Sequence, residues 1–529
     1  MKMNKIIGFL ITKNDVDIEI DFFNRGLSLL KKRCGPYNLY IWGIGNIEQC
    51  VIKGKYSLSF PLHDNLLDRN VLITLQDNKI IVENDWLGSI PVFYNPQELI
   101  VSTNCLFCLK DKTMHPEGLA NFCEFGYSVF EQTMFKDVKF MRYYSKLIIE
   151  SDNIKIEYKE DPIYDKEFLG KETTTKDVVG MMKTYISNIE SNLDGAIILP
   201  TSGGYDSRML NYLVENKSKI RSFTYGISKD QSQSCEVIYA KKISEIFKTK
   251  WEQIELKEYH KYIDKWFSIY GFSTHLHGMY HIEFYNRILE RYSFVNPTLL
   301  SGIIGDAWAE LGKFGKIDKK DDLINLGYTH GMNLDLNFLM FYYDDSTKRE
   351  YFNKNKTYLK NDKLKSVYAM RTKLILISYL AQIPEYFGIP VWTPFLNFDI
   401  VKATLNLPDE QRKSRAWERD FFRSVGLNLE DMNLKCVKSN RLDYEIAKNA
   451  KFEPIDVELL STYIKKERLI EINKYLENLS IYEYLKNELL YIPKIGGILR
   501  RLGFKNEFLK ALYEYYVIKA IEKGLKYES

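Results

Sequence analysis

The sequence predicts a mixed α/β protein of two domains, and three observations support this prediction. The chain has 529 residues, which is more than one ordinary hydrophobic core accommodates. Residues 1–165 contain short apolar runs separated by polar turns, which indicates an α+β domain rich in strands. From about residue 170 apolar runs alternate with helical stretches, as in a parallel α/β sheet, and after about residue 320 the pattern is mostly helical.

Composition narrows the class of protein. Hydrophobic residues make up 45% and charged residues 27% of the chain, as in globular proteins. The net charge is only +4 and no long basic block occurs, so we expect no nucleic-acid partner. No apolar run reaches the length of a membrane span, and the short N-terminal run lacks a cleavage site, so we expect a cytoplasmic protein without membrane contact. Seven scattered cysteines suit a reducing compartment better than a disulfide framework.

The strands of the first domain follow from its apolar runs. The stretches 71–86, VLITLQDNKIIVENDW, and 146–158, KLIIESDNIKIEY, each predict two strands joined by a polar turn. The stretch 85–103 continues in the same style. Cys105 and Cys108 form a CxxC pair, but no second pair accompanies them, so a redox or metal role is the less favoured interpretation.

The second domain begins with regularly alternating elements. We predict a helix over 175–192, a strand over 196–199, a turn and helix, a strand over 222–225, a helix over 234–247 and a strand within 251–256. The last stretch, 497–529, predicts one or two basic amphipathic helices. We expect them to pack on the domain with one solvated face, which we favour over membrane contact.

The turn after the first of these strands, 200–210, has the sequence PTSGGYDSRML. Gly203 and Gly204 let backbone N–H groups approach an anion, and the following helix adds its positive end. Ser202 and Ser207 add hydroxyl groups. Asp206 would repel an anion unless it holds a magnesium ion that bridges to the phosphates. A tight turn without a ligand is the alternative.

A second loop supplies another carboxylate. The stretch 298–312, TLLSGIIGDAWAELG, has an apolar run that ends in Ser301-Gly302, with Asp306 four residues further on. Loops at the carboxyl ends of neighbouring parallel strands converge on one crevice. Asp206 and Asp306 are therefore predicted to share a metal ion.

These motifs resemble those of the asparagine synthetase superfamily, which includes asparagine, β-lactam and lasso-peptide macrolactam synthetases. SGGYDS is similar to the family's pyrophosphate loop, and SGIIGDAWAELG to its second metal-binding loop. The stretch from Arg221 to Phe247 and the stretch from Thr393 to Val425 resemble further family blocks. Parts of the first domain look like the family's glutaminase-type αββα sandwich, so the likeness covers most of residues 1–445.

The resemblance implies a set of site residues. The pyrophosphate side of ATP would be bound by Ser202, Gly203, Gly204, Asp206 and Ser207, the nucleotide would be contacted by Thr201, Tyr225, Ser301 and Gly302, and Mg²⁺ would be bound by Asp206 and Asp306. Lys438 is the match to the family's catalytic lysine, with Lys435 or a plain surface lysine as alternatives.

The residues that depart from the family pattern indicate which kind of family member to expect. Glutamine-hydrolysing members carry a cysteine nucleophile directly after the initiator methionine, whereas this chain begins Met-Lys-Met-Asn. We therefore expect residues 1–165 to form a degenerate glutamine amidotransferase-like domain, and residues 170–529 an asparagine synthetase-like ATP-pyrophosphatase domain. Asn397 and Ala307 replace usual acidic residues, which argues against asparagine synthesis itself. The β-lactam and lasso-peptide branches also carry an inactive first domain.

The predicted activity is an ATP-dependent ligase that adenylates a carboxylate, releases pyrophosphate and transfers the acyl group to an amine. ATP and Mg²⁺ are the expected cofactors. The carboxylate would belong to a small molecule, a sugar acid or a peptide, and a separate amine-donor protein and a homodimer stay open as partners. A non-catalytic scaffold and a tRNA-modifying enzyme are the alternatives.

Three histidines lie close together in the sequence, and they also raise the question of a metal. They are His275, His277 and His281. The last two have a spacing that can bind zinc on a helix. No HExxH motif accompanies them, so we favour a pocket rim or ordinary packing.

Overall fold

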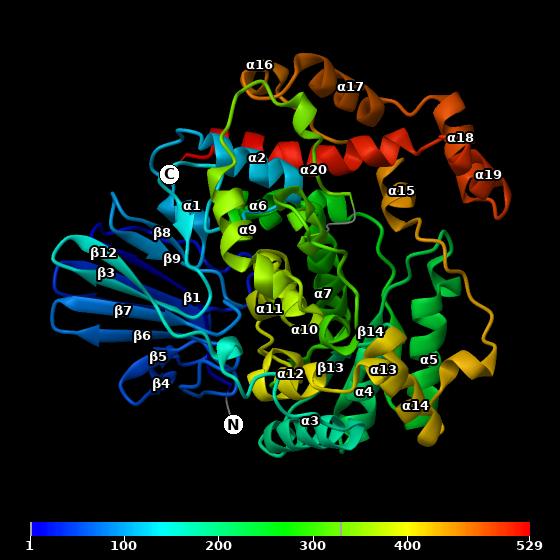
Figure 1. The fold of residues 1–529 in the computed structure, drawn as a ribbon, viewed down its shortest axis with the longest axis horizontal. Helices are drawn as coiled ribbons and strands as arrows, with labels where there is room; N and C mark the ends of the chain where they lie inside the picture. The colour runs from blue at the N-terminus through cyan, green and yellow to red at the C-terminus, as the bar shows by residue number, and fades with distance from the viewer. Residues whose placement is uncertain (1–2, 328–330, 529) are drawn as a thin grey trace.

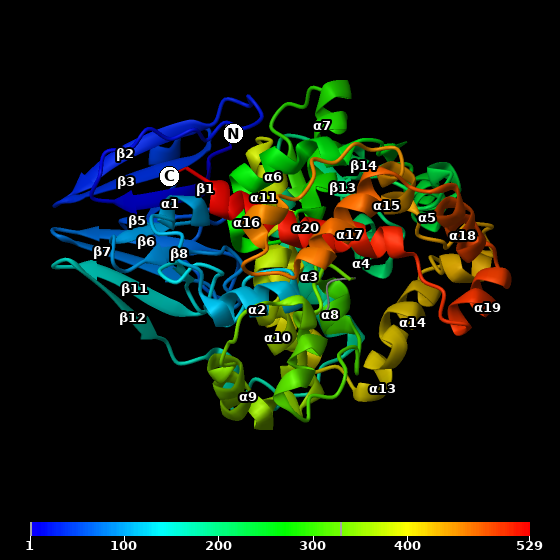
Figure 2. The same cartoon turned by 90° about the horizontal axis from the view of Figure 1, so that it is seen from above.

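The computed structural model describes residues 3–327 and 331–528. The N-terminal part consists of two antiparallel six-stranded sheets that lie face to face, one above the other in Figure 2. The first sheet has the order β10 (Lys139–Phe140), β8 (Phe93–Asn95), β9 (Ile100–Ser102), β1 (Lys5–Thr12), β3 (Tyr37–Ile44) and β2 (Ser28–Cys34). The second has the order β12 (Asn153–Tyr158), β11 (Ser145–Glu150), β7 (Lys79–Asn84), β6 (Val71–Gln76), β5 (Lys55–Ser57) and β4 (Val51–Ile52).

Apolar side chains that alternate along the strands point inward and form the core between these sheets. Phe9 and Ile11 of β1 and Ile73 and Val82 of the second sheet are fully buried in one apolar cluster. Helices α1 (Cys105–Cys108) and α2 (Pro116–Phe125) belong to the core on the other side of the first sheet.

The outer face of the second sheet differs from the expected αββα arrangement. In the described part of the chain it carries surface ion pairs, such as Lys79 with Glu150 and Lys159 with Glu83, where a helical layer was expected. Alternating charged side chains suit a sheet face in contact with water, so this face needs no helical cover.

The C-terminal part is built on a parallel five-stranded sheet. Its order is β15 (Lys250–Gln253), β14 (Ile220–Thr224), β13 (Ile197–Pro200), β16 (Thr298–Leu300) and β17 (Val391–Trp392). In chain order this is 3-2-1-4-5, so the direction of winding reverses between β13 and β16. Ligands of such sheets bind at the carboxyl ends of the strands beside this switch point.

Helices surround this sheet, and the colour gradient in Figure 1 follows them from green to red. They are α3 (Thr175–Glu190), α4 (Tyr205–Leu213), α5 (Cys235–Phe247), α6 (Ile263–Tyr270), α7 (Tyr280–Arg291), α8 (Gly305–Ala309), α9 (Ser346–Leu359), α10 (Asp362–Thr372), α11 (Leu374–Tyr386), α12 (Phe398–Leu405), α13 (Asp409–Arg412), α14 (Ala416–Ser424), α15 (Leu442–Ala447), α16 (Val457–Leu460), α17 (Lys466–Glu477), α18 (Ile481–Tyr491), α19 (Ile495–Arg501) and α20 (Glu507–Lys526). Across the described residues, none of the helices has the length and apolar character that crossing a membrane requires.

Buried ion pairs join the two parts of the molecule. Arg371 of α10 donates to both carboxylate oxygens of Asp161, at 2.6 and 2.9 Å. Arg69 makes a similar pair with Glu385 of α11, at 2.7 and 3.0 Å. Each ion pair crosses the boundary between the sandwich and the helices. The two parts of the molecule therefore share one continuous interior.

The sequence-based prediction of a mixed α/β fold with a parallel sheet is confirmed. Two further expectations need correction. Cys235 and Cys436 form a disulfide, whereas the scattered cysteines had favoured free thiols throughout. Helix α20 is buried along most of its length rather than lying on the surface, because Leu512, Tyr516 and Val517 fill the helical core.

Candidate nucleotide site

A cavity of about 490 Å³ opens at the switch point of the parallel sheet. Its lining comes from the ends of β13, β14 and β16 and from helices α4, α5, α7 and α11. Eight of the predicted site residues line it: Thr201, Ser202, Gly204, Asp206, Ser207, Tyr225, Ser301 and Gly302. The topology thus brings together residues that lie a hundred positions apart in the sequence.

The loop between β13 and α4 is shaped for a close approach of backbone N–H groups. Gly204 caps α4 without any side-chain hydrogen bond to the first turn, so the N–H groups of that turn remain for a ligand. Gly203 has a φ of +80°, and a Cβ there would lie 2.3 Å from the Cβ of Tyr239. Glycine at 203 is therefore required by the turn and by its packing, although this residue does not itself line the cavity.

Arg208 is hydrogen-bonded to this loop. Its guanidinium donates to the carbonyl of Gly203 at 2.9 Å and to both carboxylate oxygens of Glu430, at 2.9 and 3.0 Å. The side chain of Arg208 is buried, so its charge is satisfied within the protein. Arg208 was not singled out in the sequence, and it serves to fix the loop rather than to reach the cavity.

The hydroxyl of Thr201 is also engaged by the protein. It donates to the carbonyl of Leu199 at 3.0 Å and accepts from the side-chain amide of Asn211 at 3.0 Å. Ser207 donates to the carbonyl of Gly204 at 3.2 Å. Of the predicted hydroxyl donors in this loop, Ser202 lies most openly at the cavity, because its residue is exposed.

The two aspartates approach each other across the ends of β13 and β16. Gly305 packs directly against Asp206, and a Cβ at position 305 would lie 2.6 Å from Oδ1 of that aspartate. Asp306 is the next residue along the chain, in the first turn of α8. The chain around Asp306 therefore lies beside Asp206, whereas Asp306 itself does not line the cavity. That the two carboxylates share a metal ion stays a prediction.

Two cations that sequence reasoning missed face these carboxylates. Arg415 donates to Oδ1 of Asp206 at 2.5 Å and also to both oxygens of Glu418. Lys313 donates to Oδ2 of Asp306. Partial burial, together with the positive charge of Arg415, lowers the pKa of Lys313 to about 8. Arg415 lies in a sequence block that was recognised as a whole, without a role for this residue.

Burial also acts on the acids of this cluster. Burial raises the pKa of Asp206 above its ordinary value, although Arg415 opposes the shift. Burial raises the pKa of Glu418 to about 8, again against the influence of Arg415. A carboxylate that is removed from water in this way is ionised more readily when a cation lies beside it.

The donor set suits a magnesium ion. Asp206 and Asp306 offer hard oxygen ligands, which Mg²⁺ prefers. Arg415 and Lys313 each take one oxygen of their aspartate, which leaves the second oxygen of each for another cation. Within residues 3–327 and 331–528, no group of three or more His, Cys, Asp or Glu side chains forms a complete metal cage. Two carboxylates plus phosphate oxygens are the usual way in which Mg²⁺ binds to nucleotide enzymes.

A second cavity of about 370 Å³ adjoins the first, and the two share Tyr225, Ile227 and Leu380 in their walls. His277 lies in the wall of the second cavity, with its Nε2 3.0 Å from Oδ1 of Asp443. Burial would raise the pKa of Asp443, but His277 and two tyrosine hydroxyls lower it to about 2. The cavity therefore presents an ionised carboxylate that holds a histidine in place.

Lys373 forms another part of this wall. Burial lowers the pKa of Lys373 to about 8, and its ammonium lies 5.5 Å from the ring centroid of Phe314. In the described ranges no carboxylate comes within ion-pair distance of it. The charge of Lys373 also contributes to the lowered pKa of Lys313, so the two lysines lie near one another.

Lys438 lies elsewhere. It is exposed, lines neither cavity and belongs to a segment that runs beside the start of α5, where Val437 pairs with Ser234 and the disulfide joins Cys436 to Cys235. Lys435 is exposed as well. The assignment of a catalytic role to Lys438 stays a prediction.

The other motifs from the sequence are buried. His281 lines the first cavity and His275 the second, and burial lowers the pKa of each to about 3. Both imidazoles are therefore neutral parts of the cavity walls. Cys105 and Cys108 are fully buried in α1, and burial raises the pKa of both thiols. Thiols in such a setting are unreactive.

Comparison with known proteins adds little to this geometry. No family model and no curated protein matches the chain. Among solved structures, the chain is similar to an NH3-dependent NAD synthetase from Campylobacter jejuni, with 14% identity and a TM-score of 0.20 over 45% of this chain and 96% of that one. Because a TM-score this low defines no shared arrangement of the site, the function of this chain is inferred from its own residues.

Proposed function

We propose that this protein is an ATP-dependent, AMP-forming amide ligase. The observation that carries the proposal is the position of the Ser202–Gly204 loop, Asp206 and the Ser301–Ile304 loop, which leads to Asp306, at one cavity beside the switch point of a parallel sheet. A loop of free N–H groups beside two carboxylates suits a polyphosphate accompanied by a divalent cation.

In the first half-reaction, an oxygen of the substrate carboxylate attacks the α-phosphorus of ATP. A bond forms between that oxygen and phosphorus, and the bond to the β-phosphate oxygen breaks, which releases pyrophosphate. Negative charge grows on the pyrophosphate, where the first turn of α4, Lys313 and Arg415 stabilise it. Asp206 and Asp306 would hold Mg²⁺, which supplies several kcal/mol of charge neutralisation.

In the second half-reaction, an amine attacks the acyl carbon and AMP leaves. The adjoining cavity supports this step because it shares a wall with the nucleotide cavity and contains the His277–Asp443 pair. A histidine held by a buried carboxylate suits the role of a general base that takes the proton from the attacking amine. Lys373, in the same wall, suits the stabilisation of negative charge at the acyl centre.

The products of ATP cleavage test this proposal. Purified protein is incubated with ATP, Mg²⁺ and a panel of carboxylates and amines, and the nucleotides are separated by chromatography. Attack at the α-phosphorus yields AMP and pyrophosphate, which is the expected result. ADP as the main product would contradict the proposal, because it requires attack at the γ-phosphorus.

A further inference from the structure

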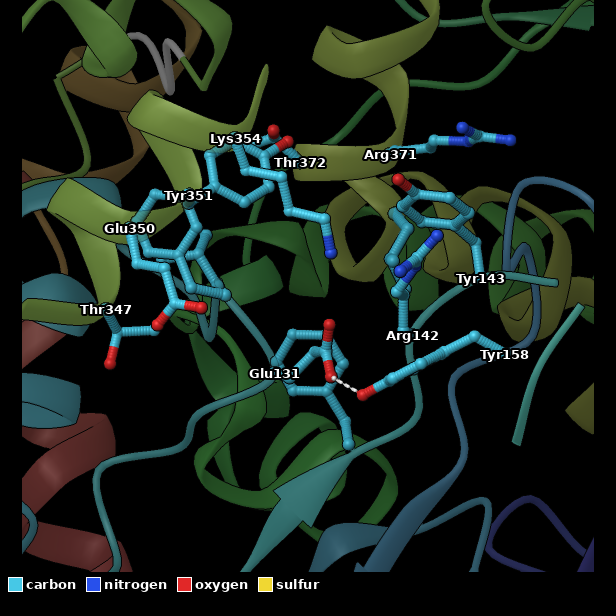
Figure 3. A pocket seen from close by; sticks show the side chains of 14 residues that line it. Glu131, Arg142, Tyr143, Tyr158, Thr347, Glu350, Tyr351, Lys354, Arg371 and Thr372 are labelled. Atoms are coloured by element: carbon cyan, nitrogen blue, oxygen red, sulfur yellow. Dashed lines mark hydrogen bonds between the residues drawn. The ribbon is translucent and has the colours of Figure 1, made fainter. Parts of the chain in front are cut away.

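A third cavity, of about 320 Å³, lies between the sandwich and helices α9 and α10. It shares no lining residue with the two cavities of the proposed ligase site. Figure 3 shows its charged and aromatic lining, which comes from both parts of the molecule. Glu131, Arg142 and Tyr158 belong to the sandwich side, and Lys354 and Thr372 to the helical side.

Two cationic side chains converge on this cavity. Arg142 lies over the rings of Tyr143 and Tyr158, with its guanidinium carbon 4.8 and 4.7 Å from the ring centroids. Its Nε is buried and has no hydrogen-bond partner. Lys354 points toward Arg142 from the opposite wall (Figure 3). Neither cation has a carboxylate within ion-pair distance in the described part of the chain, so an anion between them would relieve their mutual repulsion.

An acid lies on the other side of the same space. Glu131 accepts a hydrogen bond from the hydroxyl of Tyr158 at 3.2 Å. Burial raises the pKa of Glu131, although Arg142 opposes the shift. Phe130 and Glu131 have φ values of +56° and +62°, so two successive non-glycine residues adopt the left-handed conformation. This conformation is strained for residues with a side chain, and such strain concentrates at ligand sites.

The neighbouring Arg371, in contrast, has its charge neutralised by groups of the protein. It is bound by Asp161 and by the carbonyl of Trp86, and its guanidinium lies 3.6 Å from the ring centroid of Tyr143. Its charge needs no further partner. Arg142 and Lys354 therefore differ from it in having charge left for a ligand.

We propose that this cavity binds a small organic acid that also carries an amino or hydroxyl group. The acid's carboxylate lies between Arg142 and Lys354, and its amino or hydroxyl group donates to Glu131. Tyr143, Tyr158 and Tyr351 form the walls around its carbon skeleton. Because its lining comes from both parts of the molecule, the bound acid bridges the sandwich and α9.

Matched acids test this proposal by calorimetry and thermal melting of the full chain. Two trios serve as probes: phenylalanine, phenyllactate and 3-phenylpropionate, and glutamate, 2-hydroxyglutarate and glutarate. We expect an amino or hydroxy acid of at least one trio to bind, with its unsubstituted counterpart at least tenfold weaker. Binding by no member of either trio, or equal binding by an unsubstituted acid, would overturn the proposal.

Variants locate the binding. Lys354→Gln lies on an exposed helix position and should fold normally, yet weaken binding at least tenfold, as should Arg142→Gln. Lys356→Gln, on the same helix but outside the cavity, is the matched control and should bind like the parent chain. Unchanged binding in Lys354→Gln and Arg142→Gln would place the acid elsewhere and refute the assignment.

Discussion

Arg371 and Arg415 each pair with a carboxylate, but in different settings. Arg371 and Asp161 are 1% and 2% exposed, and two hydrogen bonds between them join the sandwich to the helical part. Arg415 and Asp206 are 16% and 19% exposed, and Asp206 lines the candidate nucleotide cavity. The first pair is closed to any ligand, whereas the second can exchange partners. The same kind of ion pair thus joins the two parts of the molecule in one region and lies at the proposed binding site in the other.

The largest expected effect is on stability. Arg371→Leu leaves the buried Asp161 without its cation, and breaking a buried pair in this way costs about 3–5 kcal/mol. Denaturant unfolding of this variant should show a loss of that size. Asp206→Asn leaves Arg415 paired with Glu418, so it should lose much less stability but most of its adenylation activity. If Asp206→Asn were the less stable of the two, the division between closed and open pairs would be wrong.

The next effect concerns the charge at the open site. Removing one group that stabilises a developing anion costs roughly 10²–10³ in rate, so Lys313→Met should lower pyrophosphate exchange by that factor. Because the pKa of Lys313 is lowered to about 8, the ammonium loses its proton as the pH rises through about 8. Exchange should fall over that range in the parent chain.

Lys313→Arg provides the matched control for this pH dependence. A guanidinium stays protonated at all relevant pH values, so the alkaline fall should move upward or disappear. An unchanged alkaline limb in Lys313→Arg would show that another group titrates.

Alanine substitutions at the two loop glycines, Gly203 and Gly204, should differ in their effect on stability. Gly203→Ala places a Cβ at a φ of +80° and 2.3 Å from Tyr239, so we expect a loss of about 1–3 kcal/mol in stability and weaker ATP binding. At Gly204 the nearest atom to an added Cβ is Ser202 Oγ, at 3.4 Å, and the backbone is extended. Gly204→Ala should therefore fold like the parent chain. Equal melting temperatures for the two variants would contradict this account of the loop.

Much of the lining of the candidate site could be predicted because its determinants are local in sequence. The order of strand, Ser-Gly-Gly turn and helix can be recognised without coordinates, and parallel topology places Ser301 and Gly302 beside the same cavity. Lys313, Arg415 and Lys373 could not be anticipated, because single basic residues carry no pattern and their roles depend on which carboxylates the fold brings to them. The disulfide between Cys235 and Cys436 escaped for the same reason, since the two lie 201 residues apart.

One step of the proposed reaction, amide formation, distinguishes two lysines. Losing one charged hydrogen bond costs about 1.5–3 kcal/mol, or at least tenfold in rate. We expect Lys373→Met to slow amide formation by about that factor, since Lys373 lies in a cavity wall, and Lys438→Ala to change it less, since Lys438 is exposed. Single-turnover assays with preformed acyl-adenylate measure this step alone. A larger loss in Lys438→Ala would restore the catalytic role predicted from the sequence.

The central claim is that Asp206 and Asp306 act together in adenylation, and carboxylate-dependent exchange of labelled pyrophosphate into ATP tests it most directly. Asp206→Asn and Asp306→Asn keep the size of each side chain and remove its charge. With the carboxylate that supports exchange in the parent chain, we expect each variant to lose at least 100-fold in exchange while its melting temperature stays within a few degrees. Near-normal exchange in either variant would contradict the shared role of the two aspartates.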